Sequence, residues 1–233
     1  MYENGGLCGG NGHRVYPQRA SRGLHPAFWR ECGEKSLAGR GLPSVPFLKP
    51  DELVNELINY SLELGITRAG VIRAGDIIVR EEVVSAGCAG CPEYGHNLMC
   101  PPSIPPPDKF REMLASYSKG ILLQLEAPLR PDPAGNGYSE AFIHAGRLHS
   151  MVCRIERRGR EMGFVRARGF IGGCCRLCGS CPGPGERCRH PETARSSMEA
   201  NGISVVETCA GAGWPLEFPV KDRVTWTGLV LLD

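Results

Sequence analysis

Four cysteines in the C-terminal half of the chain carry the clearest chemistry in the sequence. Cys175, Cys178 and Cys181 follow one another with two residues between each pair, and Cys188 lies a short distance further on. Thiolates are the ligands that hold iron–sulfur clusters, and a loop with this spacing can wrap one face of a cubic cluster while a more distant cysteine binds the remaining iron. We therefore expect these four cysteines to bind a [4Fe–4S] cluster.

Zinc is the competing metal for this loop. Structural zinc sites usually bring two close cysteine pairs together, whereas three cysteines at two-residue intervals suit a cube better than a single tetrahedral ion. A disulfide cluster is the third interpretation, and it requires an oxidising compartment. Cys174 directly precedes Cys175, and we expect it to face away from the metal, because its use as a ligand would break the even spacing.

A second cysteine loop lies earlier in the chain. Cys88 and Cys91 are separated by two residues, and Cys100 follows with eight residues between it and Cys91. Three thiolates can hold a cube that leaves one iron open to a substrate, or they can hold zinc with His96 as the fourth ligand. The fourth ligand could also come from elsewhere in the fold. We expect a second metal centre here and leave its metal and fourth ligand open.

Other polar residues near the cysteines have weaker signals. Arg189 and His190 follow Cys188, where a cation would raise the reduction potential of a cluster and an imidazole could relay protons; His190 could equally pack the turn before a proline. On the longest predicted helix, His149 and Cys153 are one turn apart and could approach a metal, although a lone cysteine is more often a buried apolar residue. Glu156, on the same helix, is interpreted as part of a solvated charged face.

The composition limits the functional classes. The chain has 12 cysteines among 233 residues and a formal net charge of only +2, which is not the basic excess typical of nucleic-acid-binding proteins. The N-terminal stretch has no apolar core of the kind a signal peptide needs, and no apolar run has the length of a membrane span. We therefore expect a cytoplasmic protein that binds neither nucleic acid nor membranes, with closely spaced cysteines acting as ligands.

The chain divides into two parts. Residues 1–47 are rich in Gly, Arg and Pro and show no periodicity, which predicts a flexible extension that contains Cys8 and Cys32 as unliganded thiols. Residues 48–233 are expected to form the cysteine-rich metal-binding domain.

Helical and strand patterns alternate within residues 48–233. Apolar residues at helical spacing predict a helix that begins after Asp51 as its N-cap and ends at Gly65, and further helices over residues 108–117, 139–162 and 197–201. Short apolar runs predict strands over residues 66–73, 77–79, 121–125, 164–170, 203–206 and 225–232. The alternation predicts an α/β or α+β fold, with a single mixed sheet, flanking helices and two metal loops that could meet at one end of it.

Three segments resemble a known family. These are YGHNLMCPP in the first cysteine loop, CRLCGSC in the second, and CRHPETARSSMEANGISVVET after it. Together they resemble the small cysteine-rich proteins described as predicted metal-binding proteins and found in anaerobic bacteria and methanogenic archaea, over Lys49 to Asp233. Ser196 stands where the family usually has proline. The resemblance implies metal binding through the seven cysteines of the two loops and implies no particular reaction.

These observations favour an iron–sulfur protein that transfers electrons to or from a redox partner protein. The alternative is a redox enzyme in which the open iron of the three-cysteine cluster performs reductive or desulfurising chemistry on a small-molecule substrate. The third hypothesis is a zinc-stabilised interaction module without a redox role.

Overall fold

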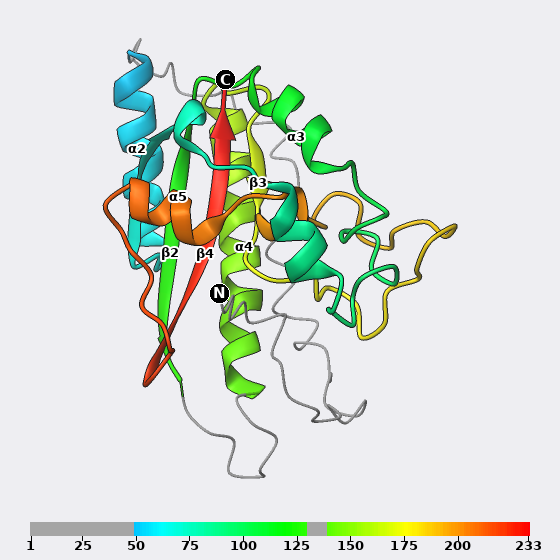
Figure 1. The fold of residues 1–233 in the computed structure, drawn as a ribbon. Helices are drawn as coiled ribbons and strands as arrows, with labels where there is room; N and C mark the ends of the chain where they lie inside the picture. Colours follow the sequence, from blue (N-terminus) through cyan, green and yellow to red (C-terminus); the bar gives the residue numbers. More distant parts are fainter. Residues whose placement is uncertain (1–48, 130–138) are drawn as a thin grey trace.

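Four antiparallel strands form the sheet at the centre of the protein. The structure is a computed structural model that describes residues 49–129 and 139–233, so the predicted extension over residues 1–47 lies outside the described residues (Figure 1). The strands lie in the order β1-β2-β4-β3. Their bounds are Arg68–Arg73 for β1, Lys119–Pro128 for β2, Arg168–Phe170 for β3 and Arg223–Leu232 for β4.

Helices cover both faces of this sheet. Side chains alternate along a strand, so Ile121 and Leu123 of β2 face one side and Leu122 faces the other. The first face packs against α2 (Pro50–Glu63) and α4 (Ser139–Glu161), and the second packs against α3 (Pro107–Leu114) and α5 (Val205–Gly211). Within the ranges that the structure describes, none of the helices combines the length and the apolar character that crossing a bilayer requires.

The first helix is close to its predicted position but has a different cap. The N-cap is Lys49, whose N–H donates to the Glu52 carboxylate at 2.8 Å, and Pro50 follows where its missing N–H costs nothing. The prediction that Asp51 caps the helix is therefore wrong, because Asp51 lies inside the first turn. Gly65 follows the helix with a φ of 96°, a conformation that only glycine adopts without strain.

The architecture confirms a single sheet with flanking helices and is of the α+β kind. Where a mixed sheet was expected, all three described strand pairings are antiparallel. The predicted strand over residues 203–206 is wrong, because Val205 begins α5 and only Ile203 forms an isolated bridge, with Val79. The apolar run over residues 77–79 likewise joins no strand, since Ile78 hydrogen-bonds to α5 and its N-cap: Ile78 N donates to Thr208 Oγ1 at 3.1 Å, and Ile78 O accepts the N–H of Ser204 at 2.8 Å.

Both cysteine loops project from one side of the sheet and lie side by side (Figure 1). The second loop leaves the sheet after β3 and returns at a short parallel bridge between Ile171 and Ser197. The Ile171 N–H donates to Ser196 O at 3.1 Å, and the Met198 N–H donates to Ile171 O at 2.9 Å. The first loop follows η2, a single wide helical turn over Val83–Cys88 that contacts η3 (Glu199–Asn201) just after that bridge. The bases of the two cysteine loops are thus held close together.

Candidate metal centres

Consecutive turns fold the first cysteine loop. The N–H of Cys91 donates to Cys88 O at 2.9 Å, the N–H of Gly95 donates to Pro101 O at 2.9 Å, and the N–H of Cys100 donates to Asn97 O at 3.0 Å. As a result, the Cys100 thiol lies within electrostatic range of the thiols of Cys88 and Cys91. The three cysteines predicted to share a metal are therefore gathered by local backbone geometry.

Asn97 joins the first loop to the second. Its side chain is buried, and its Nδ2 donates to Cys175 O and to Glu93 Oε2, each at 2.9 Å, while its Oδ1 accepts the N–H of Met99 at 3.0 Å. The next N–H, that of Leu98, donates to the Cys181 sulfur at 3.4 Å. Sequence spacing did not single out Asn97, since its importance comes from a contact between distant segments.

Replacing Asn97 with alanine is expected to destabilise the folded protein by about 2 kcal/mol, because it leaves the part-buried carbonyl of Cys175 and the N–H of Met99 without their Asn97 partner. The measurement is a denaturant midpoint on protein prepared without oxygen. His96→Ala is the matched control, because the His96 side chain is exposed next to it. An N97A midpoint equal to that of H96A would contradict this role.

The second loop gathers a separate group of thiols. The Cys175 thiol lies within electrostatic range of those of Cys178 and Cys188. The Cys188 sulfur accepts the N–H of His190 at 3.4 Å, and the Cys181 sulfur accepts that of Leu98. Backbone N–H groups that point at sulfur are the outer contacts that metal–thiolate sites use.

Arg189 and His190, directly after Cys188, contact the second loop in different ways. The side chains of Arg189 and His190 are exposed, and Arg189 Nη1 donates to Ser180 O at 2.9 Å across the mouth of the loop. His190 reaches the Cys188 sulfur with its main-chain N–H. The Arg189 guanidinium therefore lies beside the loop, while the His190 contact is one that any non-proline residue could make, and the role predicted for both side chains at a cluster stays a prediction.

Helix α4 holds the end of the second loop. His149 and Cys153, one turn apart, are both buried, and both contact the carbonyl oxygen of Thr193, at 2.8 Å from His149 Nε2 and 3.3 Å from Cys153 Sγ. Burial lowers the pKa of His149 to about 4, so the ring is neutral at pH 7 and Nε2 donates to the carbonyl. This pair anchors the loop to α4.

Cys174 belongs with the first group of thiols. Its thiol is buried and lies within electrostatic range of that of Cys91, and the Cys100 thiol in turn has Cys174 among its neighbours. Cys174 was expected to face away from the metal of the second loop, and its described thiol neighbours are those of the first loop.

Burial makes the thiolate forms of both groups costly. It raises the pKa of Cys88 and of Cys175 to about 11 and that of Cys174 to about 12, and it also raises the pKa of Cys100. Metal ligation requires the thiolate, so a bound cation would compensate this burial and release protons. Among the described side chains of residues 49–129 and 141–233, no three of His, Cys, Asp or Glu form the close arrangement that a single metal ion takes.

Comparison with known proteins agrees with this donor chemistry. Residues 70–232 match the model of a family described as predicted metal-binding protein (DUF2284). The chain belongs to this family. The match includes every cysteine of both loops and Cys174, and it leaves out α2. Neither the curated proteins nor the solved structures gave a match.

Glu199 lies beside the first cysteine loop. The spacing of residues in the sequence did not indicate this position. Its carboxylate accepts hydrogen bonds from the Ser197 hydroxyl and the Gly173 N–H and lies within electrostatic range of the Cys88 thiol. Burial raises its pKa, and its buried Oε2 has no hydrogen-bond partner among the described residues. Ser196 and Glu199 have capping-box spacing, but it is Ser197 Oγ that accepts the N–H of Ala200, at 3.0 Å.

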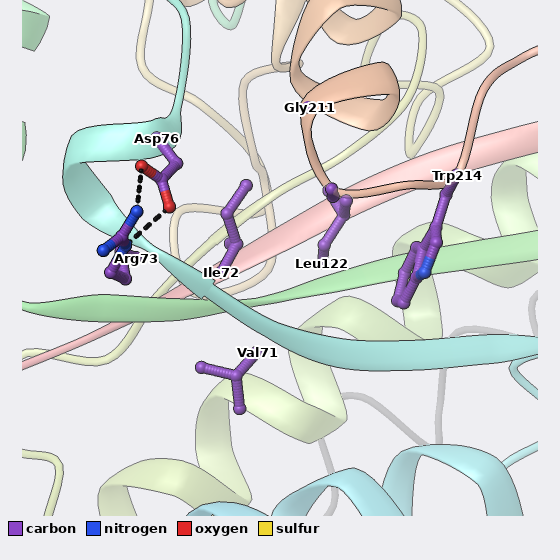
Figure 2. Close-up of a pocket in the computed structure, with 8 residues that line it drawn as sticks. Val71, Ile72, Arg73, Asp76, Leu122, Gly211 and Trp214 are labelled. Atoms are coloured by element: carbon purple, nitrogen blue, oxygen red, sulfur yellow. Dashed lines mark hydrogen bonds and ion pairs between the residues drawn. The ribbon is translucent and has the colours of Figure 1, made fainter.

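Two hollows lie on the described surface. One of about 500 Å³ borders the first cysteine loop, and its lining includes Val84, Ala89 and Tyr94. The other, of about 270 Å³, lies between β1 and the end of α5, with the Arg73–Asp76 ion pair at one side and Trp214 at the other (Figure 2). No described cysteine lines either hollow, but the first one borders the segment between Cys88 and Cys100 through Ala89 and Tyr94, whereas the second is lined by β1 and by residues at the end of α5.

Proposed function

We propose that this protein is an iron–sulfur protein that transfers electrons. Cys175, Cys178, Cys181 and Cys188 bind a [4Fe–4S] cluster, and the cysteines of the first loop hold a second metal centre. The observation that carries the proposal is the arrangement of the two loops. Each loop brings several thiols within electrostatic range of one another, and the first loop donates two hydrogen bonds to the second, from Asn97 Nδ2 to Cys175 O and from the Leu98 N–H to the Cys181 sulfur. Such proximity suits two centres that exchange electrons.

The ligand chemistry supports iron–sulfur over zinc at the second loop. The donors are all thiols, their spacing suits a cube, and N–H groups of Leu98 and His190 donate to sulfur. When bound, a cluster of this kind takes up and releases single electrons. The N–H donors and the Arg189 cation stabilise the added negative charge and so raise the reduction potential.

The exposure of the second loop suggests where a partner approaches. Cys178, Cys181 and Cys188 are half-buried, and residues 184–187 beside them are exposed. A redox partner protein would therefore exchange electrons at this loop, while the first centre, with Cys100 buried, lies further from solvent. We place this function in the cytoplasm, where thiols stay reduced.

A redox enzyme is the second candidate, and the hollow beside the first loop is the observation that favours it. A small molecule bound against Ala89 and Tyr94 would lie next to the segment that carries Cys88 and Cys91 and could reach an iron left open by three thiolates. In that case the first centre would perform reductive or desulfurising chemistry, and the second would deliver the electrons.

Metal content measured on protein prepared without oxygen tests the proposal. We expect a brown protein with a broad absorption band in the blue and with about eight iron and eight sulfide per chain. A colourless protein with stoichiometric zinc would overturn both redox functions and favour a zinc-stabilised interaction module. Iron and sulfide at about half the expected amount would restrict the proposal to one centre.

A further inference from the structure

We propose that Cys174 is the fourth thiolate ligand of the first metal centre, together with Cys88, Cys91 and Cys100. The inference rests on the proposed function, since it assumes that the first loop binds iron. It converts that centre from three protein ligands to four. It also divides two adjacent cysteines between two metal centres, with Cys174 in the first and Cys175 in the second.

The backbone before Cys174 is tightly held. After β3, Gly172 and Gly173 lie close to β4: a Cβ on Gly172 would lie 2.8 Å from Thr227 O, and one on Gly173 would lie 3.1 Å from Trp226 Cζ3. Gly173 has a φ of 74°, and its N–H donates to the Glu199 carboxylate. Because two successive residues admit no side chain without displacement of these neighbours, the position of Cys174 is set by packing.

The backbone after Cys174 is held against the first loop. The carbonyl of Cys175 accepts the Asn97 amide at 2.9 Å, and the same amide donates to Glu93. Glu93 lies within electrostatic range of both Cys174 and Cys100, so these two thiols have a common charged neighbour. Successive side chains leave a backbone in different directions, which allows Cys174 to reach the first loop while Cys175 reaches the second.

The burial of Cys174 matches that of an inner ligand. Cys174 and Cys100 are each 7% exposed, whereas Cys88 and Cys91 are half-buried. The two buried cysteines therefore close the protein side of the centre, and the other two face the surface of the loop. With four thiolates on the first centre, no iron stays open to a substrate, so the inference favours electron transfer over the enzyme hypothesis.

Iron and sulfide analysis of C174A, prepared without oxygen, tests the inference. Cys209→Ala is the matched control, because Cys209 is also a buried cysteine and contacts Gln124 instead of the loop thiols. We expect C209A to keep the iron content of the unmodified protein and C174A to lose between about one and about four iron per chain. The electron paramagnetic resonance signal of the reduced second centre should remain in C174A.

The outcomes separate this inference from the function on which it rests. Absence of iron from the unmodified protein would refute the proposed function, whereas equal iron in the unmodified protein and C174A would refute only the role of Cys174. If C174A does not fold, C174S preserves the side-chain volume, and its oxygen is a weaker iron ligand. The spectrum of the first centre should then shift in C174S and not in C209S; identical spectra would overturn the inference.

Discussion

C178A is expected to fold and to lose about half of the iron and sulfide of the unmodified protein. Cys178 is half-buried in the second loop, and its thiol lies within electrostatic range of that of Cys175. Removing it takes away one ligand of the proposed cluster without opening a cavity in either hydrophobic core, because those cores lie on the two faces of the sheet. The loss should therefore appear in metal content and absorption far more than in stability of the backbone fold.

The control for this variant is C153A. Cys153 belongs to neither loop, but its sulfur contacts Thr193 at the end of the second loop, so the variant tests packing beside the same site without removing a proposed ligand. We expect C153A to keep full iron content. Equal iron in C178A and the unmodified protein would contradict the assignment of the second loop, and a loss of all iron would show that the two centres assemble as one unit.

The local part of the site was predictable from sequence because its signals are local. Cys175, Cys178 and Cys181 are spaced for one metal, and the structure folds them into a single projecting loop. Ligation by these cysteines stays a prediction. The same holds for the first loop, where turns between near neighbours gather the thiols.

Long-range contacts were not predictable in this way. The importance of Asn97 depends on a hydrogen bond to Cys175, 78 positions away, and nothing in the spacing of the first loop indicates it. Cys174 was excluded from the second loop by its spacing, and only the folded structure places its thiol within electrostatic range of the thiols of Cys91 and Cys100. Each cysteine loop can be recognised in the sequence by itself, but the contacts between the two loops are seen only in the folded structure.

The sequence also predicted some elements of the fold correctly and others wrongly. The long amphipathic pattern of α4 and the apolar runs of β2 and β4 identified those elements, because each one buries a full face. The short run over residues 203–206 has the composition of a strand, but Ile203 makes only one bridge and the following residues turn into α5. A short apolar run does not decide between strand and helix, and in this protein the residues from Val205 onward form a helix whose Thr208 hydroxyl accepts the N–H of Ile78.

Glu156→Ala is expected to destabilise the protein by about 3–5 kcal/mol, a larger effect on stability than that of N97A. The prediction of a solvated face was wrong for this residue, whose side chain is 1% exposed. Its carboxylate accepts two hydrogen bonds from Arg195, at 2.6 and 2.9 Å, one from the Gly169 N–H at 2.9 Å, and one from Arg160. It therefore joins α4 to β3 and to the segment that follows the second cysteine loop.

The cost arises because E156A leaves its partners behind. Arg195 is only 15% exposed on its side chain and would keep a charge without the carboxylate that balances it, and the Gly169 N–H would lose its acceptor. The melting temperature should fall by roughly 10 °C for a chain of this size. Arg160→Ala is the control, since the Arg160 side chain is 51% exposed and its ion pair with Glu156 should contribute less than about 1 kcal/mol.

The same variant also probes how the fold supports the second centre. The backbone N–H of Arg195 donates to the Cys175 thiol, so loosening Arg195 should weaken metal retention by the second loop before the sheet unfolds. In a denaturant titration of E156A followed by absorption and circular dichroism, iron loss should therefore precede loss of secondary structure, whereas in R160A the two transitions should coincide. Coincident transitions in E156A, or a midpoint equal to that of R160A, would show that Glu156 does not connect the core to the loop.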